Sequence, residues 1–192
     1  MVRVLLFGAG ATGARIARQL RSSGAVDTLE IRDPSLERRE RLVDDLGDGA
    51  VAGHGRRISG DPGVVVIATP PSTQLDVARR AIREGIAVVT TSNQTSEVRR
   101  LLELDDEARS RRVPVVVGAG FMPGLSCVLA RHGAREFDEV EEVHVAKVGT
   151  GGPACARQHH RALSSTGIDW RDGRWMRRAG GSGRELAWFP DP

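Results

Sequence analysis

The chain has 192 residues, with 28 Lys or Arg, 25 Asp or Glu, a formal net charge of +3 at pH 7 and 40% hydrophobic residues. This composition excludes a wholly disordered chain and allows one domain of roughly 150 residues plus a further segment. No apolar run approaches the ~20 residues of a membrane span, the N-terminus shows no secretory cleavage signal, and two cysteines are too few for a disulfide framework, so we expect a cytoplasmic protein without membrane contact.

Short apolar segments alternate with helical patterns up to Val117. Strands are predicted at 2–7, 28–33, 50–57 (a short one), 64–68, 86–91 and 113–117. Helices are predicted at 11–20, from Pro34 through Val43, from Leu75 to Gly85, and at 95–110. Strands that alternate with helices of this length form right-handed βαβ crossovers, so the pattern predicts an α/β fold with a Rossmann-type, doubly wound parallel sheet.

The pattern changes after Val117. It predicts a helix over 123–137, an alternating strand over 139–148, a helix over 152–165, and a β-hairpin that turns at Asp172-Gly173 between Trp170 and Trp175. We therefore divide the chain into a dinucleotide-binding domain, 1–122, and a partial α+β substrate or dimerisation domain, 123–192.

A glycine fingerprint follows the first strand. Gly8-Ala-Gly10-Ala-Thr-Gly13 reads G-x-G-x-x-G, opens a predicted helix, and is followed 20 residues later by Asp33 at the end of the next strand. Gly8 permits the tight turn, Gly10 lets the backbone approach a pyrophosphate, and Gly13 allows close helix–sheet contact. The free N–H groups and the dipole of the helix then stabilise the diphosphate charge.

Asp33 favours NAD over NADP, because a carboxylate accepts hydrogen bonds from the ribose hydroxyls and repels a 2′-phosphate. NADP stays open, since Arg32, Arg38 and Arg39 are close in sequence and could pair with a phosphate. The segment Thr69–Thr73 follows a strand, so it borders the same crevice. The expected cofactor residues are Gly8, Gly10, Ala11, Thr12, Gly13, Asp33, Ala68, Thr69 and Pro70.

A second glycine segment, Gly118-Ala-Gly-Phe-Met-Pro-Gly-Leu-Ser126, again joins a strand to a helix, with Pro123 placed for the first helical turn. Helix N–H groups at this edge of the sheet would lie near a nicotinamide or an anionic substrate. Met122, Pro123 and Gly124 are the candidate substrate residues. The alternative is a simple connector between domains.

Together with the first fingerprint and Asp33, this second segment resembles the saccharopine dehydrogenase-like family over about residues 1–148. The resemblance implies an NAD(P)-dependent reductase or dehydrogenase of amino-acid metabolism that acts at a C–N bond, with a substrate domain that often forms a homodimer contact. The chain ends shortly after that domain would begin, so we expect a shortened family member or a fragment.

Two neighbouring families share parts of the pattern. The glucose–fructose oxidoreductase-like family resembles the chain at Ala68–Thr73, but this chain has Thr90-Thr-Ser-Asn93 where that family has a catalytic lysine. Dihydrodipicolinate reductases have a paired-histidine motif that His159-His160 resembles, yet the lysine that should follow is absent.

Proton transfer at a C–N bond needs an acid or base near the amine, and Lys147 and His160 are the candidates. No metal is expected, because Cys155 and His159 lack further ligands at zinc spacing. The net positive charge lies after Thr150, which favours a small carboxylate-bearing substrate over nucleic acid, since the hairpin accounts for two tryptophans. The leading hypothesis is an NAD(P)-dependent oxidoreductase, and the alternative is a dinucleotide-binding module without turnover.

Overall fold

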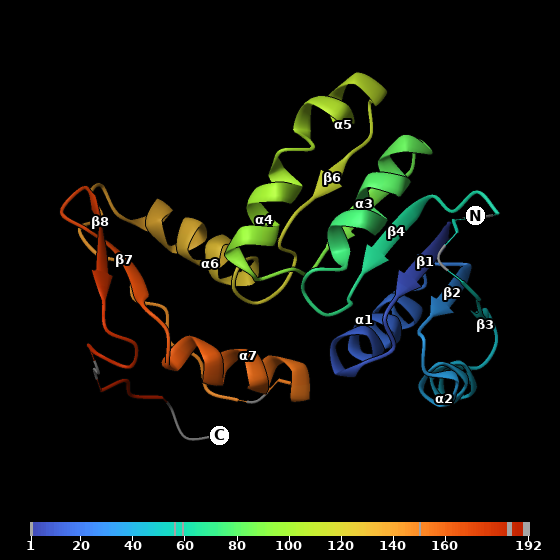
Figure 1. The fold of residues 1–192 in the computed structure, drawn as a ribbon, viewed down its shortest axis with the longest axis horizontal. Helices are drawn as coiled ribbons and strands as arrows, with labels where there is room; N and C mark the ends of the chain where they lie inside the picture. The colour runs from blue at the N-terminus through green and yellow to red at the C-terminus, as the bar shows by residue number, and fades with distance from the viewer. Residues whose placement is uncertain (1, 56, 59, 150, 184–185, 190–192) are drawn as a thin grey trace. The chain divides into compact units, whose positions relative to one another are not determined.

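The computed structural model describes residues 2–55, 57–58, 60–149, 151–183 and 186–189 (Figure 1). Its strands are β1 (Arg3–Phe7), β2 (Thr28–Arg32), β3 (Ala50–Ala52), β4 (Val64–Ile67), β5 (Ala87–Thr90), β6 (Val115–Val116), β7 (Gly167–Arg171) and β8 (Arg174–Arg178). Its helices are α1 (Ala11–Ser22), α2 (Leu36–Leu46), α3 (Gln74–Arg83), α4 (Thr95–Leu102), α5 (Asp105–Arg111), α6 (Leu125–Gly133), the 3-10 turn η1 (Ala134–Glu136) and α7 (Pro153–Leu163).

The chain forms two compact units, Met1–Val143 and His144–Pro192. The division falls after α6, whereas the sequence placed it at residue 122, before that helix. What each domain binds is not tested by this division and stays a prediction.

Unit 1 is built on a six-stranded parallel sheet in the order β3-β2-β1-β4-β5-β6. Alternate residues of the central strands enter two separate cores, which is why these strands are apolar throughout. Leu5 and Phe7 pack with α3, α4 and α5, while Val4 and Leu6 pack with α1 and α2. Figure 1 shows α1 and α2 on one side of the sheet and α3 to α5 on the other. The Rossmann-type α/β fold predicted from the sequence is thereby confirmed.

A buried ion pair replaces apolar packing on β2. The side chains of Glu30 and Arg32 are 8% and 5% exposed, and the Arg32 Nη2 atom lies 2.5 Å from the Glu30 Oε1 atom. The Arg32 guanidinium also lies over the Phe7 ring, 5.6 Å from its centroid. Burial raises the pKa of the Glu30 carboxyl, but hydrogen bonds from Arg32 and Arg3 and their charges outweigh it and hold that pKa below its usual value. This arginine is therefore occupied within the fold.

Three helix predictions need correction. The single helix expected over 95–110 is two helices, because Asp105, Asp106 and Glu107 favour the positive end of a new helix at α5. Pro34 lies outside α2, whose N-cap is Ser35 with its hydroxyl accepting from the Arg38 N–H at 3.4 Å. Pro123 likewise lies outside α6, and it follows a cis peptide bond from Met122.

Unit 2 contains α7 and the antiparallel hairpin β7-β8, in which Trp170 pairs with Trp175 as the sequence predicted. The strand predicted over 139–148 is wrong, since those residues form no strand. A strand needs a neighbouring strand to satisfy its backbone N–H and C=O groups, and the alternating valines there pair with none in the described chain. Neither α7 nor the hairpin contains a fully buried residue.

Among the described residues, no helix combines the length and the hydropathy that crossing a bilayer requires.

Candidate dinucleotide site

The first glycine segment makes a turn that only glycine fits at two positions. Gly8 has φ +106°, and a Cβ atom there would lie 2.5 Å from the Ala68 carbonyl oxygen. A Cβ at Gly13 would lie 1.8 Å from the Gly8 carbonyl oxygen. At Gly10, by contrast, a Cβ would meet no atom within 4 Å. The absence of a side chain at Gly10 therefore leaves space for something outside the fold.

Backbone donors without an acceptor follow Gly10 in the chain. Helix α1 begins at Ala11, and its first helical hydrogen bond runs from the Ala14 N–H to the Gly10 carbonyl at 2.8 Å. The N–H groups of Ala11, Thr12 and Gly13 find no acceptor among the described residues, and no side chain caps the helix. Together with the positive end of the helix dipole, these donors can hold a diphosphate.

Asp33 lies beside this turn, as its spacing predicted. Its Oδ2 atom accepts from the Ala9 N–H at 2.8 Å, and its Oδ1 atom accepts from the Ser35 N–H at 2.8 Å and from the Arg38 guanidinium at 2.9 Å. Burial raises the pKa of the Asp33 carboxyl, but these hydrogen bonds and the Arg38 charge outweigh it and hold the pKa below its usual value. A carboxylate offers about four acceptor positions, so three contacts leave room for one hydroxyl.

The three arginines near Asp33 are not equivalent. Arg32 and Arg39 are 5% and 4% exposed, and they bond to groups within the fold, including the carbonyls of Arg57 and Gly53. The Arg38 side chain is 57% exposed and lies on the Asp33 carboxylate. Arg38 is therefore the guanidinium of this set that a ligand could reach.

The loop after β4 is closely held. The Ala68 N–H donates to the Phe7 carbonyl at 2.8 Å, which brings the end of β4 beside the first glycine turn. The Thr73 hydroxyl lies 2.8 Å from both the Thr69 hydroxyl and the Pro70 carbonyl. Ala68, Thr69 and Pro70 thus border the carboxyl edge of β1 and β4, where ligands of such sheets bind.

Behind this loop lies a polar cluster that sequence reasoning missed, formed by Gln74, Ser92 and Glu97. These residues are 2%, 1% and 4% exposed. Gln74 and Glu97 belong to amphipathic helices, where polar residues ordinarily face solvent. No local signal in the sequence marks them as buried.

The second glycine segment closes on itself. The Gly120 N–H donates to the Pro123 carbonyl at 3.1 Å, and a Cβ atom at Gly124, where φ is +129°, would lie 2.1 Å from the Gly120 carbonyl oxygen. The first three N–H groups of α6, those of Leu125, Ser126 and Cys127, donate to carbonyls of Gly120, Phe121 and Gly124 at 2.9, 2.9 and 3.0 Å. The helix donors expected to face a nicotinamide or anionic substrate are therefore already bonded.

The proton-transfer candidates lie in unit 2, where Lys147 and His160 are exposed. Their role is untested. Cys127 is exposed and Cys155 is partly buried, and both are free thiols. Within the described residues, no three His, Cys, Asp or Glu side chains are grouped closely enough to hold a metal ion.

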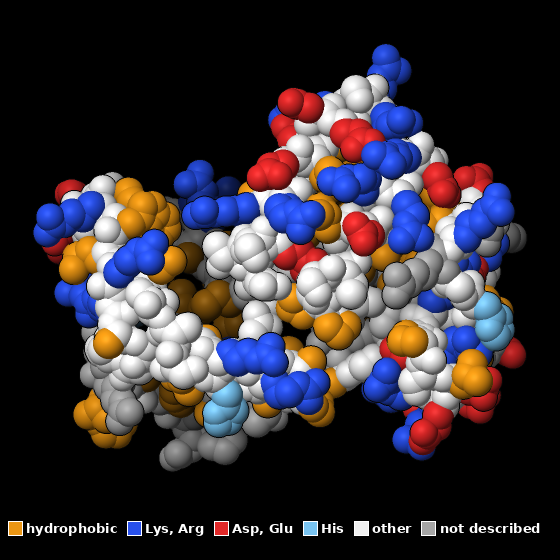
Figure 2. All heavy atoms as spheres, viewed as in Figure 1, with side chains coloured by type: hydrophobic (Ala, Val, Ile, Leu, Met, Phe, Trp, Pro, Cys, Tyr) orange, Lys and Arg blue, Asp and Glu red, His pale blue; other side chains and the backbone are white. Residues whose placement is uncertain are grey.

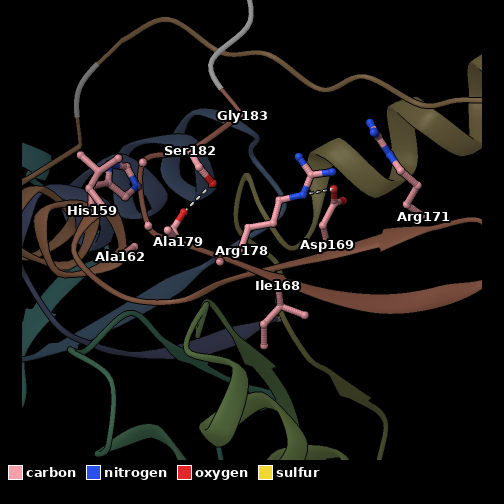
Figure 3. A pocket seen from close by; sticks show the side chains of 13 residues that line it. His159, Ala162, Ile168, Asp169, Arg171, Arg178, Ala179, Ser182 and Gly183 are labelled. Atoms are coloured by element: carbon pink, nitrogen blue, oxygen red, sulfur yellow. Dashed lines mark hydrogen bonds and ion pairs between the residues drawn. The ribbon is translucent and has the colours of Figure 1, made fainter.

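A separate hollow in unit 2 lies between the end of α7 and the hairpin (Figure 3). His159 lines it from the helix, and Asp169 and Arg178, whose Oδ2 and Nε atoms are 3.6 Å apart, line it from the strands. Over α4 and α5 of unit 1, acidic and basic side chains are intermixed, with Arg109 and Asp105 paired at 2.7 Å (Figure 2). Neither surface includes the glycine turn.

Comparisons with solved structures show related folds. Saccharopine dehydrogenase (L-Glu forming) from Saccharomyces cerevisiae matches with a TM-score of 0.71 and 19% identity, covering 99% of this chain and 48% of that one. A myo-inositol dehydrogenase from Corynebacterium glutamicum matches with a TM-score of 0.54 and 27% identity, covering 73% and 43%. GenD2 from gentamicin A biosynthesis, solved with NAD, matches with a TM-score of 0.52 and 24% identity, covering 69% and 38%. This chain spans less than half of each.

The model of one protein family, described as an oxidoreductase family with an NAD-binding Rossmann fold, matches residues 2–119. This is the Gfo/Idh/MocA family, the glucose–fructose oxidoreductase-like family that the Ala68–Thr73 segment resembles. The missing lysine at residues 90–93, which argued against this family in the sequence, does not exclude the chain from it. The match covers the whole parallel sheet, including the glycine turn and Asp33. The chain therefore belongs to the Gfo/Idh/MocA family of NAD-binding Rossmann oxidoreductases.

Proposed function

We propose that this chain is the cofactor-binding part of an NAD-dependent oxidoreductase that acts at the C–N bond of an amino-acid-derived amine or imine. One observation carries the cofactor assignment. The turn leaves open space over Gly10, and the three N–H groups that follow it, those of Ala11, Thr12 and Gly13, find no acceptor in the described chain. An anionic diphosphate supplies the acceptors that these donors lack.

The residues around this point divide the dinucleotide into three parts. The N–H groups of Ala11, Thr12 and Gly13 hold the diphosphate, and Asp33 on the β2 side accepts from the adenosine ribose. Ala68, Thr69 and Pro70, at the carboxyl edge of β4, would hold the nicotinamide half. When bound, the cofactor supplies hydride transfer at the nicotinamide ring.

NAD is preferred over NADP because the Asp33 carboxylate is ionised and nearly buried, which repels a 2′-phosphate. Its free acceptor position takes one ribose hydroxyl. A second hydroxyl is accepted when the exposed Arg38 side chain swings away from Asp33. NADP would bind more weakly, because its 2′-phosphate replaces a hydroxyl that can donate to this carboxylate.

The C–N substrate class rests on the extent of one structural likeness. The match with the saccharopine dehydrogenase continues over 99% of this chain, whereas the myo-inositol dehydrogenase and GenD2 cover 73% and 69%. The second glycine segment carries the same resemblance in sequence. Met122 is 54% exposed there. Met122, Pro123 and Gly124 would therefore contact the substrate through their own atoms, because the N–H groups of α6 are already bonded within the turn. Lys147 and His160 stay the candidates for proton transfer.

The test is NADH oxidation, followed by absorbance, with mixtures of a 2-keto acid and an amine or amino acid. Turnover of such mixtures, and none with polyols under NAD⁺, supports the C–N assignment. Turnover of polyols alone contradicts it. Saturable NADH binding without any turnover supports the alternative, a dinucleotide-binding module that senses redox state or serves as a subunit.

A further inference from the structure

We propose that Gln74, Glu97 and Ser92 form a positioning cluster that holds the loop after β4, residues 68–73, against the nicotinamide half of NAD. This inference rests on the cofactor placement proposed above. None of the three side chains touches the cofactor in this account. They act through the backbone of Thr69.

The cluster is a continuous chain of hydrogen bonds. The Gln74 side-chain amide donates to the Thr69 carbonyl at 2.7 Å. The backbone N–H of Gln74 donates to Glu97 Oε1 at 3.1 Å, and the Ser92 hydroxyl donates to Glu97 Oε2 at 2.6 Å. Glu97 therefore joins the start of α3 to the segment that follows β5, and Gln74 extends this connection to the loop after β4.

These contacts lie where the nicotinamide half must pass. Thr69 follows β4 and Ser92 follows β5, and the two strands pair in register, with Ile67 opposite Thr90. Both segments thus leave the sheet at its carboxyl edge, on the side of β1 away from Asp33. With the adenosine at Asp33 and the diphosphate at α1, the remaining half of the dinucleotide would extend toward these two segments.

As a purely structural element, the cluster would lower the stability of the fold. Within the described part of the chain, the buried Glu97 side chain forms no ion pair and accepts from the Gln74 N–H group and the Ser92 hydroxyl, and burying polar groups costs free energy. The buried Gln74 Oε1 atom also finds no hydrogen-bond partner among the residues that the structure describes. Exchanging the two amide atoms would not help, because the oxygen would then face the Thr69 carbonyl. An apolar pair would fill the same volume without these costs, so the polar groups serve to direct the Thr69 backbone.

The opposite side of the loop is held separately. The Thr73 hydroxyl contacts the Thr69 hydroxyl and the Pro70 carbonyl on the exposed side. Ser72, at φ +77°, has the left-handed backbone that this tight turn requires. Loss of the Gln74 contact therefore leaves the loop formed but free to shift toward or away from the bound nicotinamide.

The test compares two ligands on the full chain. NADH reaches both halves of the site, whereas ADP-ribose lacks the nicotinamide and depends on α1 and Asp33. Gln74→Met keeps the volume and removes the amide, and Ser92→Ala, a milder variant, removes one donor to Glu97. Glu103→Gln, an exposed change at the end of α4, is the matched control.

Calorimetric titration should show that Gln74→Met lowers the affinity for NADH about ten-fold, which corresponds to the loss of one well-formed hydrogen bond. The affinity for ADP-ribose should stay within two-fold of the parent value. Ser92→Ala should show the same selectivity with a smaller loss, and Glu103→Gln should change neither ligand. Equal weakening of both ligands, or no weakening of either, overturns the positioning role. If the unmodified chain binds neither ligand, the cofactor proposal itself fails, which is a distinguishable result.

Discussion

Two glycine segments of this chain have nearly the same local sequence pattern but differ in how the N–H groups of the following helix are hydrogen-bonded. Gly8–Gly13 and Gly118–Gly124 each leave a parallel strand and enter a helix. In the first, the helix donors at Ala11–Gly13 have no partner in the described chain, and the space over Gly10 is open. In the second, the donors of α6 are bonded to the turn that precedes them. A strand–glycine–helix pattern therefore predicts a tight turn. Whether the turn can bind an anion depends on whether the first N–H groups of the helix are already hydrogen-bonded.

The largest expected effect is a loss of stability caused by a substitution in the second segment. Gly124→Ala places a Cβ atom 2.1 Å from the Gly120 carbonyl oxygen at a backbone φ of +129°, so we expect unit 1 to lose about 3 kcal/mol of unfolding free energy. Denaturation in urea measures it. NADH affinity below the transition should stay within a few-fold. A variant as stable as the parent would show that the closed turn is wrong.

The next effect concerns the first segment. In Gly10→Ala, the new methyl group meets no protein atom, so the unfolding free energy should change by less than about 1 kcal/mol. The same methyl occupies the place of the diphosphate, and NADH affinity should fall roughly 100-fold, the loss of one or two charge-assisted hydrogen bonds. NADH fluorescence titration gives the affinity. Unchanged affinity would refute the cofactor assignment at this turn.

Asp33→Asn tests the ribose end of the site. It removes the charge that accepts from Ala9, Ser35 and Arg38, and we expect NADH affinity to fall about ten-fold. Because the folded pKa of Asp33 is lowered, the stability that the carboxylate contributes is present above its unfolded pKa of about 3.9 and is lost as pH falls through the folded value.

The wild-type affinity for NADH should therefore stay level from pH 8 to about pH 5, as titrations across that range will show. A midpoint near pH 6 would mean that another group controls binding.

Arg38→Ala should have the smallest effect. NADH affinity should change by no more than about three-fold, because the Arg38 side chain is 57% exposed and exposed ion pairs contribute at most about 1 kcal/mol. NADPH affinity should fall further than NADH affinity, since Arg38 is the accessible guanidinium for its 2′-phosphate. Parallel titration of the two cofactors measures the ratio. An unchanged ratio would remove Arg38 from cofactor discrimination.

Much of unit 1 was predictable because its signals are local. Apolar runs such as Val64–Ile67 and the spacing from Gly13 to Asp33 depend on a few adjacent residues, and both were confirmed in position. Contacts between distant segments were not predictable. The hydrogen bond from the Gln74 N–H group to Glu97, 23 residues later, depends on how the connection after β4 meets the connection after β5.

The segment 139–148 shows the converse, because its alternating valines predict a strand but do not provide the neighbour that a strand needs. The binding capacity of the α6 turn was unpredictable for a similar reason. Whether the N–H groups of Leu125 and Ser126 are free depends on the path of the preceding turn, which glycine and proline alone do not specify.

Amide NMR spectra recorded during an NAD⁺ titration test the contrast between the two glycine segments most directly. The account predicts saturable shifts, with the largest changes at the N–H signals of Ala11, Thr12 and Gly13, where the diphosphate adds acceptors. The signals of Leu125, Ser126 and Cys127 should keep their hydrogen-bonded character and change little. Large saturable shifts at α6, with α1 unmoved, would contradict the account.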